Sequence, residues 1–272
     1  EETILDQLIS FWEDLANVFI DDDGEVSFDE LYPKEGGRDF HTQLFTKVVG
    51  IYWSKIRIPE DTNTFTSIKL EFMQYRVNVA DLFIVIYSLL KHPFYQSLCE
   101  AVVNELSVVG SEMVSASQSR DLENTLYLIY KITDDVSYLE SLVEILVPSI
   151  EKIFAADFTS RIRSVAEEEC ILQVFTLTAI HFLASIQFYF KSPLVQGSRH
   201  LGAVLDFLFS ILLSPSPQLS LHASRTILKT CQENRDNLVE FLPSLEPLLV
   251  EMLRNINMDH LIRQRMFNAY AS

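Results

Sequence analysis

An acidic stretch near the start of the chain has the residue types and much of the spacing of a calcium-binding loop. With Gly24 at the sixth position of a twelve-residue EF-hand loop, Asp21 and Asp23 fall at positions three and five, and Glu30 falls at position twelve. Position one, which should carry a carboxylate, is Phe19. Because Ca²⁺ needs six to eight oxygen ligands, the loss of this ligand argues against calcium binding.

The residues that follow also argue against an EF-hand, which needs a helix on each side of its loop. Pro33 and the glycine pair Gly36–Gly37 interrupt any helix after Glu30. We therefore interpret residues 20–38 as an acidic insertion between two helices. It is either a solvated linker or a contact for a basic partner, inside or outside the same protein, because clustered carboxylates attract basic groups. The candidate contact residues are Asp21, Asp22, Asp23, Glu25, Asp29 and Glu30.

The remaining reactive residue types show no catalytic or metal-binding spacing. Cys99, Cys170 and Cys231 lie far apart, which argues against a disulfide framework or a zinc site and favours a reducing compartment. His181 lies in an apolar run and is interpreted as a core histidine with its hydrogen bonds satisfied. No phosphate loop and no nucleophile elbow occurs, so we expect no enzymatic activity and no cofactor. The other histidines lack metal-ligand spacing: His41, His92, His200, His222 and His260.

Two charged clusters have structural interpretations. The run Glu167–Glu169 is expected to form the solvated first turn of a helix, where carboxylates are favourable. Arg120, Arg161 and Arg163 are expected to pair with neighbouring helices, the alternative being contact with an acidic surface.

The charge of the chain restricts its partners. The net charge is −17, and residues 1–63 hold 15 acidic against five basic residues, which leaves −7 for the rest. Such a surface repels phosphate backbones and argues against nucleic-acid binding by this segment. It suits a basic protein partner, or it serves solubility alone.

One stretch is long enough to cross a membrane. Residues 170–190 contain no charged side chain. Gln173, His181 and Gln187 recur along it, however, with Thr and Ser between them. We therefore expect a helix buried among other helices, and no membrane span.

Helical periodicity dominates the sequence. The apolar side chains in 2–19 follow the i, i+3, i+4, i+7 pattern of an amphipathic helix. No segment shows the alternation of apolar and polar residues that would predict a β-strand. The same helical pattern predicts about eleven helices in all. The further helices are expected at 40–57, 68–90, 94–109, 120–133, 138–155, 162–190, 199–213, 218–232, 236–254 and 259–270.

The links between these helices and their regular spacing predict an array of repeated helix pairs. "KHP" at 91–93 and "SPSPQ" at 214–218 carry helix stop and start signals, with Ser214 or Ser216 as an N-cap. Helices taken in twos recur about every 40 to 60 residues, near the period of HEAT repeats. We therefore predict an all-α HEAT-repeat solenoid over 1–272, a right-handed superhelix of about five to six antiparallel helix pairs. The chain lacks an initiator Met, and we expect it to be an internal piece of a longer protein.

Several motifs, in this order, resemble the karyopherin-β (importin-β superfamily) nuclear transport receptors. "FWEDLANVF" (11–19) and "VVGIYWSKIRIPED" (48–61) resemble a helix and its partner in the importin-thirteen and transportin-SR branch. "EFMQYRVNVADLFIVIYSLL" (71–90) resembles that branch's "F..YR.....D.L...Y..L" helix. "SPSPQLSLHASRTILKTCQENRDNLVEFLPSL" (214–245) resembles its repeat with a Cys-containing helix. The resemblance covers nearly the whole chain and is to the middle HEAT repeats.

The resemblance implies a function, a location and a set of partners. Such a receptor binds protein cargo, exchanges it under control of the GTPase Ran, and shuttles between nucleus and cytoplasm through contacts with Phe-Gly nucleoporins. The family's main Ran site lies in other repeats, so no Ran-contact residue transfers to this sequence. Two alternatives stay open: a tRNA exportin, which shares a similar "YR" helix, and a HEAT scaffold subunit of a cytosolic complex unrelated to transport.

Overall fold

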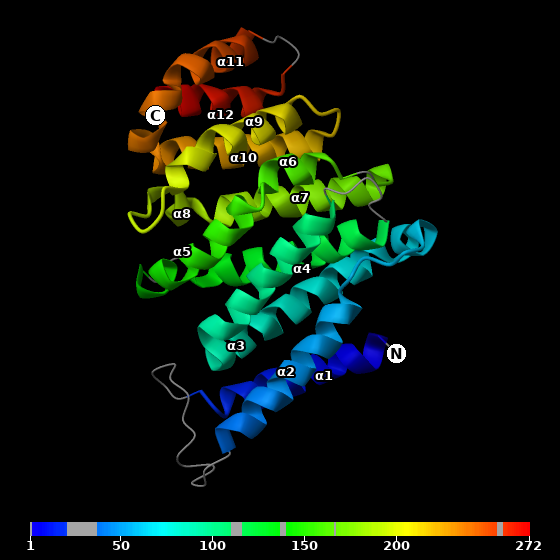
Figure 1. Ribbon diagram of the computed structural model, residues 1–272. Coiled ribbons are helices and arrows are strands. Elements are labelled where there is room, and N and C mark those ends of the chain that lie inside the picture. The colour runs from blue at the N-terminus through cyan, green and yellow to red at the C-terminus, as the bar shows by residue number, and fades with distance from the viewer. Residues whose placement is uncertain (1, 21–36, 110–115, 137–139, 166, 255–257) are drawn as a thin grey trace.

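The protein was analysed as a computed structural model, which describes residues 2–20, 37–109, 116–136, 140–165, 167–254 and 258–272. All regular secondary structure in these ranges is helical, as predicted (Figure 1). The helices are α1 (Glu2–Asn17), α2 (Gly37–Lys55), α3 (Thr62–Val109), α4 (Ala116–Val136), α5 (Glu140–Ala155), α6 (Phe158–Arg163), α7 (Glu169–Ser185), α8 (Gln187–Lys191), η1 (Gly197–His200), α9 (Leu201–Leu212), α10 (Pro217–Glu233), η2 (Arg235–Phe241), α11 (Leu242–Arg254) and α12 (His260–Ala271).

Helix boundaries fall where the sequence carries proline or a capping residue. Lys91 has non-helical dihedrals (φ 56°, ψ −151°) and divides α3 into two rods, and Pro93 opens the second rod, where its missing N–H has no cost. Pro217 is the first residue of α10. The Asp259 carboxylate caps α12 by accepting hydrogen bonds from two backbone N–H groups. The breaks predicted at "KHP" and "SPSPQ" are confirmed, although Ser216 makes no side-chain cap.

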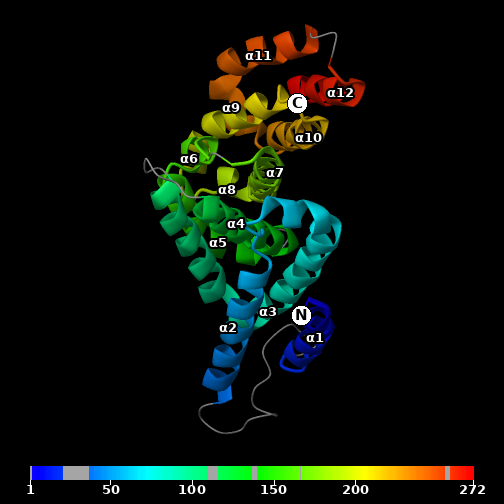
Figure 2. The same ribbon diagram turned by 90° about the vertical axis from the view of Figure 1, so that its right-hand side faces the viewer.

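The helices stack in two layers. In one layer α1 contacts α3, α3 contacts α4, α4 contacts α7, α7 contacts α10 and α10 contacts α12. In the other, α5 contacts α3 and α6, and α6 contacts α9. Figure 2 shows α1, α7, α10 and α12 on its right-hand side and α2, α5, α6 and α9 on its left. Each helix therefore packs on its neighbours in the stack.

The apolar core runs the length of this stack. A continuous cluster of buried side chains extends from Ile9 in α1 to Ala269 in α12. A smaller cluster around Ile58, Phe65 and Ile171 joins the start of α3 to the start of α7. Burying apolar surface contributes roughly 25 cal/mol per Å². The two layers are therefore held together mainly by the faces that their helices bury.

Two predicted helices are divided in the structure. The predicted helix 162–190 comprises the end of α6, a link, α7 and α8, with a break at Ile186 (φ −98°, ψ 24°). After that break the Gln187 amide donates to the Leu183 carbonyl at 2.7 Å, a local bond that competes with regular helix structure. The predicted helix 236–254 begins as the 3₁₀ helix η2, because Pro243 cannot continue an α-helical hydrogen-bond ladder from the preceding turn.

Among the described residues one helix passes a length and composition test for a membrane span. It covers Thr62–Val108, in which one 18-residue window reaches a mean hydropathy of 1.3. Its interruption at Lys91 leaves two shorter rods, and a buried core helix passes the same test. The finding is therefore weak evidence for a span. The apolar run 170–190 forms the shorter helices α7 and α8.

Candidate functional site

The predicted basic-partner contact lies outside the described residues, as do all six of its carboxylates: Asp21, Asp22, Asp23, Glu25, Asp29 and Glu30. Phe19, at position one of the EF-hand comparison, is described and buried. Its ring centroid lies 4.0 Å from that of His41 and 6.3 Å from that of Phe45. Phe19 is thus a core residue between α1 and α2, a role that an unpaired carboxylate could not fill.

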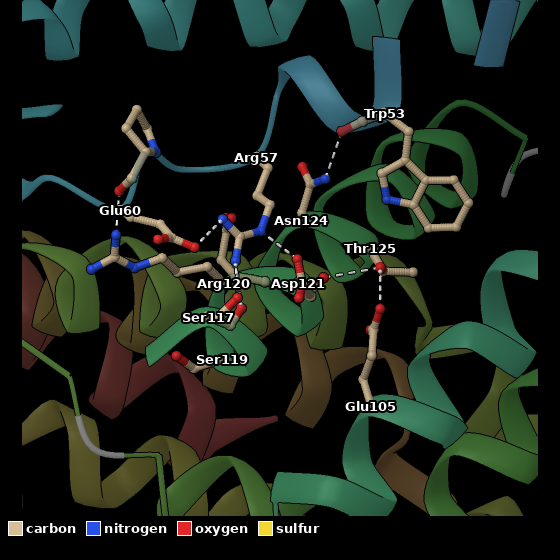
Figure 3. Close-up of polar contacts among 12 residues, drawn as sticks. Trp53, Arg57, Glu60, Glu105, Ser117, Ser119, Arg120, Asp121, Asn124 and Thr125 are labelled. Atoms are coloured by element: carbon tan, nitrogen blue, oxygen red, sulfur yellow. Dashed lines mark hydrogen bonds and ion pairs between the residues drawn. The ribbon is translucent and has the colours of Figure 1, made fainter. Parts of the chain in front are cut away.

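A polar network ties the end of α2 to the start of α4 (Figure 3). Arg57 pairs with Asp121 and donates to the carbonyl (2.9 Å) and hydroxyl (2.6 Å) oxygens of Ser117. The Asn124 amide donates to the Trp53 carbonyl at 2.8 Å, near the end of α2, where carbonyls lack helical partners. The network fixes the position of α4 and of the side chains that α4 presents to the surface.

Arg120 and Glu167 form a buried ion pair that joins α4 to the link before α7. Their side chains are 3% and 2% exposed, and Nη2 of Arg120 lies 3.5 Å from Oε2 of Glu167. Arg120 also donates to the Pro59 carbonyl, and the Ser119 hydroxyl donates to Glu167. The predicted solvated turn is therefore wrong for Glu167. A charge this deeply buried is tolerated only beside a counter-charge.

The predicted pairing of the arginines with neighbouring helices is confirmed for Arg161, whereas the partners of Arg120, Pro59 and Glu167, lie in the links before α3 and α7. Arg161 donates to the carbonyl of Leu106 at 2.6 Å, which links α6 to the end of α3. Arg163 lies 5.9 Å from the ring centroid of Phe207 in α9, within cation–π range.

A second buried ion pair connects three successive helices. Arg76 of α3 binds Glu123 of α4 through both guanidinium nitrogens, at 3.1 and 2.9 Å. Glu123 also accepts from the Thr178 hydroxyl of α7 at 2.7 Å, and the Arg76 guanidinium lies 4.0 Å from the Tyr127 ring centroid. These contacts fix the buried side chains of Tyr127 and Thr178 beside one another between the helices.

Aromatic side chains continue from this pair across the same layer. Tyr130 of α4 stacks on His181 of α7, with centroids 5.4 Å apart and planes at 22°. His181 meets His222 of α10 edge to face at 4.9 Å. His181 is half-buried, so its prediction as a core histidine is only partly right. Its place in the surface row comes from the packing of α7 between α4 and α10.

Cations lie along this aromatic row. The Lys131 ammonium lies 5.9 Å from the Tyr127 ring and 5.7 Å from the Tyr130 ring. Arg265 of α12 donates to the Leu221 carbonyl at 2.9 Å, which holds it against α10. Exposed Arg225 has no hydrogen-bond or ion-pair partner among the described residues. We refer to these residues together as the aromatic–basic face: Tyr130, Lys131, His181, His222, Arg225 and Arg265.

The electrostatics of the face are consistent with this excess of positive charge. Burial, together with His222 and Lys131, lowers the pKa of His181 to about 4. Burial, together with Arg225 and Arg265, also lowers the pKa of His222. Both histidines are therefore neutral near pH 7, and the charge of the face comes from Lys131, Arg225 and Arg265.

A cavity of about 210 Å³ opens beside this face. Its walls come from α3, α4, α7 and α10 and include Met73, Tyr127, Leu177, Thr178 and His181. Tyr127 is only 3% exposed, and its hydroxyl has no hydrogen-bond partner in the described part of the chain. Burial raises the pKa of Tyr127 to about 12, so the hydroxyl keeps its proton. We call this the Tyr127 cavity.

The described residues offer little for catalysis or metal binding. No group of three or more His, Cys, Asp or Glu side chains among them could hold a metal ion. All three cysteines are free, and burial raises the pKa of Cys99 and raises that of Cys231 to about 11, so neither is a ready thiolate.

No protein-family model and no curated protein matches the sequence.

Sequence reasoning missed the aromatic–basic face, although part of its signal is present. Gln218, His222 and Arg225 recur at a helical spacing along residues 217–233 and so share one side of α10. The alignment of that side with Tyr130 and His181 depends on which helices are neighbours, and periodicity within one helix does not carry this information.

Proposed function

We propose that this chain is a middle HEAT-repeat segment of a nuclear transport receptor of the importin-β superfamily, in the importin-thirteen and transportin-SR branch. In this proposal the helices form a right-handed superhelix of antiparallel pairs that binds protein cargo. Ran in its GTP-bound form controls cargo exchange in the full-length protein, and Phe-Gly nucleoporins carry the receptor between nucleus and cytoplasm.

One observation supports the proposal most. The helices α4, α7, α10 and α12 contact one another in succession, so that one layer of the stack has a long continuous surface. Arrays in which each repeat contacts mainly its neighbours can change pitch with little local strain. Such an array suits a receptor in which two ligands bias the same flexible scaffold and change each other's affinity. The proposed family rests on the resemblance of the sequence motifs at 11–19, 48–61, 71–90 and 214–245.

The function we propose is binding, without catalysis. The charges buried between the helices are engaged with one another: Arg76 with Glu123, and Arg120 with Glu167. They hold adjacent helices in register. The half-buried and exposed groups of the aromatic–basic face are the ones available to a partner.

The proposal is tested by affinity capture from cell extract with the full-length protein, with and without Ran locked in its GTP state. We expect the set of retained proteins to change when Ran·GTP is added, because the two ligands are coupled. Unchanged cargo binding would contradict the proposal and favour a static HEAT scaffold. Retention of tRNA in a Ran·GTP-dependent manner would favour the tRNA exportin alternative.

A further inference from the structure

The aromatic–basic face holds three cations, Lys131, Arg225 and Arg265, and one carboxylate, Asp134, lies close enough to oppose the lowering of the His181 pKa. Arg225 and Lys131 form no ion pair with a described carboxylate, and Arg265 is bound to a carbonyl and a hydroxyl group, neither of which is charged. Asp259, which acts on the charge of Arg265, is engaged as the cap of α12. In a chain of net charge −17, this grouping is a local reversal of sign.

The acidic groups of the same layer include residues of α1, α3 and α4, and Asp134 acts on the imidazole of His181. Asp81, Asp134 and Asp135 are close enough that, after burial, Asp134 and Asp81 raise the pKa of Asp135. Asp81 likewise raises the pKa of Glu13 in α1, after burial. The layer therefore carries carboxylates on α1, α3 and α4, and the cations Arg225 and Arg265 on α10 and α12. A bound partner of uneven charge would have one favoured orientation.

The Tyr127 cavity adds an anchor point beside the basic side chains. Its volume of about 210 Å³ lies below the roughly 300 to 1,000 Å³ of small-molecule sites and suits a single side chain. Met73, Val174 and Leu177 give it an apolar side, polar side chains line the rest, and the unpartnered Tyr127 hydroxyl supplies a buried donor. A buried donor without a partner destabilises the fold, and an acceptor on a ligand would remove that cost.

We propose that the aromatic–basic face and the Tyr127 cavity together bind an acidic, extended segment of a protein partner. One large apolar side chain of the segment enters the cavity, and its carboxylates lie over Lys131, Arg225 and Arg265. This inference rests on the proposed function and deepens it, since it names the chemistry of a cargo or regulatory segment. Helices packed about 9 Å apart place α4 and α12 about 27 Å from each other, a span of about eight or nine extended residues.

A protein segment fits these observations better than RNA does. Asp134 lies on α4 one turn from Lys131, with Asp81 and Asp135 close by, so a polyphosphate backbone extended along the row would meet carboxylates that repel it. The stacked pair Tyr130–His181 has its ring faces turned toward each other, with planes at 22°, so that they are not a free platform for bases.

The test uses the 272-residue chain and a fluorescein-labelled, glutamate-rich peptide of about nine residues with one central phenylalanine. Fluorescence anisotropy measures its affinity. We expect the double variant Lys131→Gln/Arg225→Gln to lower the affinity at least about tenfold, and added salt to do the same to the wild type. The matched control is Lys47→Gln/Arg254→Gln, which removes the same charge from exposed positions in α2 and α11 and should bind like the wild type.

Two further variants test the cavity. Tyr127→Phe removes only the hydroxyl, so we expect weaker binding with unchanged or higher stability, because an unsatisfied polar group is deleted. Leu177→Trp fills the cavity and should abolish the preference for a peptide with phenylalanine over one with glycine. Thermal unfolding followed by circular dichroism establishes that each variant is folded.

The outcomes separate this inference from the proposed function. Equal binding by the wild type and Lys131→Gln/Arg225→Gln, or tighter binding of a lysine-rich peptide or of single-stranded RNA, would overturn the inference. If Ran·GTP-dependent capture persisted in that case, the proposed function would stand alone. Peptide binding that depends on Lys131 and Arg225 without any Ran effect would support the binding surface and contradict the transport function.

Discussion

The buried charges set the stability of individual contacts between helices. Arg76 is fully buried and Glu123 is 1% exposed, so neither can be solvated if its partner is lost. Three interactions converge on Glu123, from Arg76 twice and from Thr178. Breaking a pair of this kind costs more than replacing both members with apolar groups.

We expect Glu123→Ala to lower the free energy of unfolding by roughly 3 to 5 kcal/mol, because Arg76 is left buried without a counter-charge. The double variant Arg76→Met/Glu123→Leu should lose less than this single variant. Urea denaturation followed by circular dichroism measures both. The control is Glu100→Ala, which breaks the exposed Lys152–Glu100 pair and should cost less than about 1 kcal/mol. A double variant less stable than Glu123→Ala would refute the expectation.

Glu105 predicts a pH dependence of stability. Burial raises its pKa to about 7, with Asp121 adding to the effect and the Thr125 hydroxyl, at 3.0 Å, opposing it. Between the ordinary pKa of 4.5 and pH 7 the folded state holds a proton that the unfolded state has lost. The wild type therefore loses stability as the pH rises through this window.

We expect Glu105→Gln, which does not titrate, to raise the free energy of unfolding above pH 7 by roughly 1 to 3 kcal/mol. The gain should shrink toward zero as the pH falls to 4.5. His181 has the opposite effect in the same window, but it is present in both proteins and cancels in the difference. Urea titrations at a series of pH values measure the gain, and an equal gain at pH 5 and pH 8 would count against the assignment.

Among the helices, α3 stores backbone strain at its break. Lys91 has φ 56° and ψ −151°. Residues with a Cβ atom rarely adopt this backbone conformation, whereas glycine adopts it readily. The break separates the rod that carries Arg76 from the rod that Pro93 begins, and both rods bind α4, through Arg76–Glu123 and Tyr95–Thr133. The strain is held there by packing on both sides.

We expect Lys91→Gly to raise the free energy of unfolding by about 1 kcal/mol, because the relief of strain outweighs the entropy that glycine loses on folding. Lys91→Ala keeps the Cβ and should give no gain. Chemical denaturation compares the two variants with the wild type. A gain in Lys91→Ala equal to that in Lys91→Gly would show that the lysine side chain, and not the backbone, is responsible.

At the scale of the whole molecule, the apolar core is extended along the stack and is not gathered at one central point. The core extends from α1 to α12, and each helix packs on its neighbours (Figures 1 and 2). Successive helices along the chain therefore lengthen the stack in one direction. A compact domain of this chain length would have a radius of gyration of about 19 Å.

We expect small-angle X-ray scattering of the 272-residue chain to give a radius of gyration above about 19 Å, with a pair-distance distribution extended toward long distances. The expectation follows from stacking layers in one direction. A symmetric distribution with a radius at or below that value would contradict the arrangement. Measurement over a series of protein concentrations serves as the control for self-association.

Local sequence signals predict the helices and several of the residues at which the helices begin or end. The 3.6-residue period, the prolines at 93 and 217 and the "KHP" joint each act over a few residues, and the predicted all-helical class and breaks agree with the structure. The prediction was wrong where a distant partner intervened. Glu167 lies 47 residues from Arg120, and no local pattern in the sequence indicates that they meet.

The aromatic–basic face shows the same division. The sequence predicts that Tyr130, His181 and His222 lie on three separate helices. Their alignment depends on the packing of α4, α7 and α10 side by side and on the rotation of each helix about its axis, which the buried pair Arg76–Glu123 and its contact with Thr178 help to fix. Helix formation is governed by near neighbours along the chain, whereas a surface shared by several helices is governed by long-range packing, and for this reason only the folded chain reveals it.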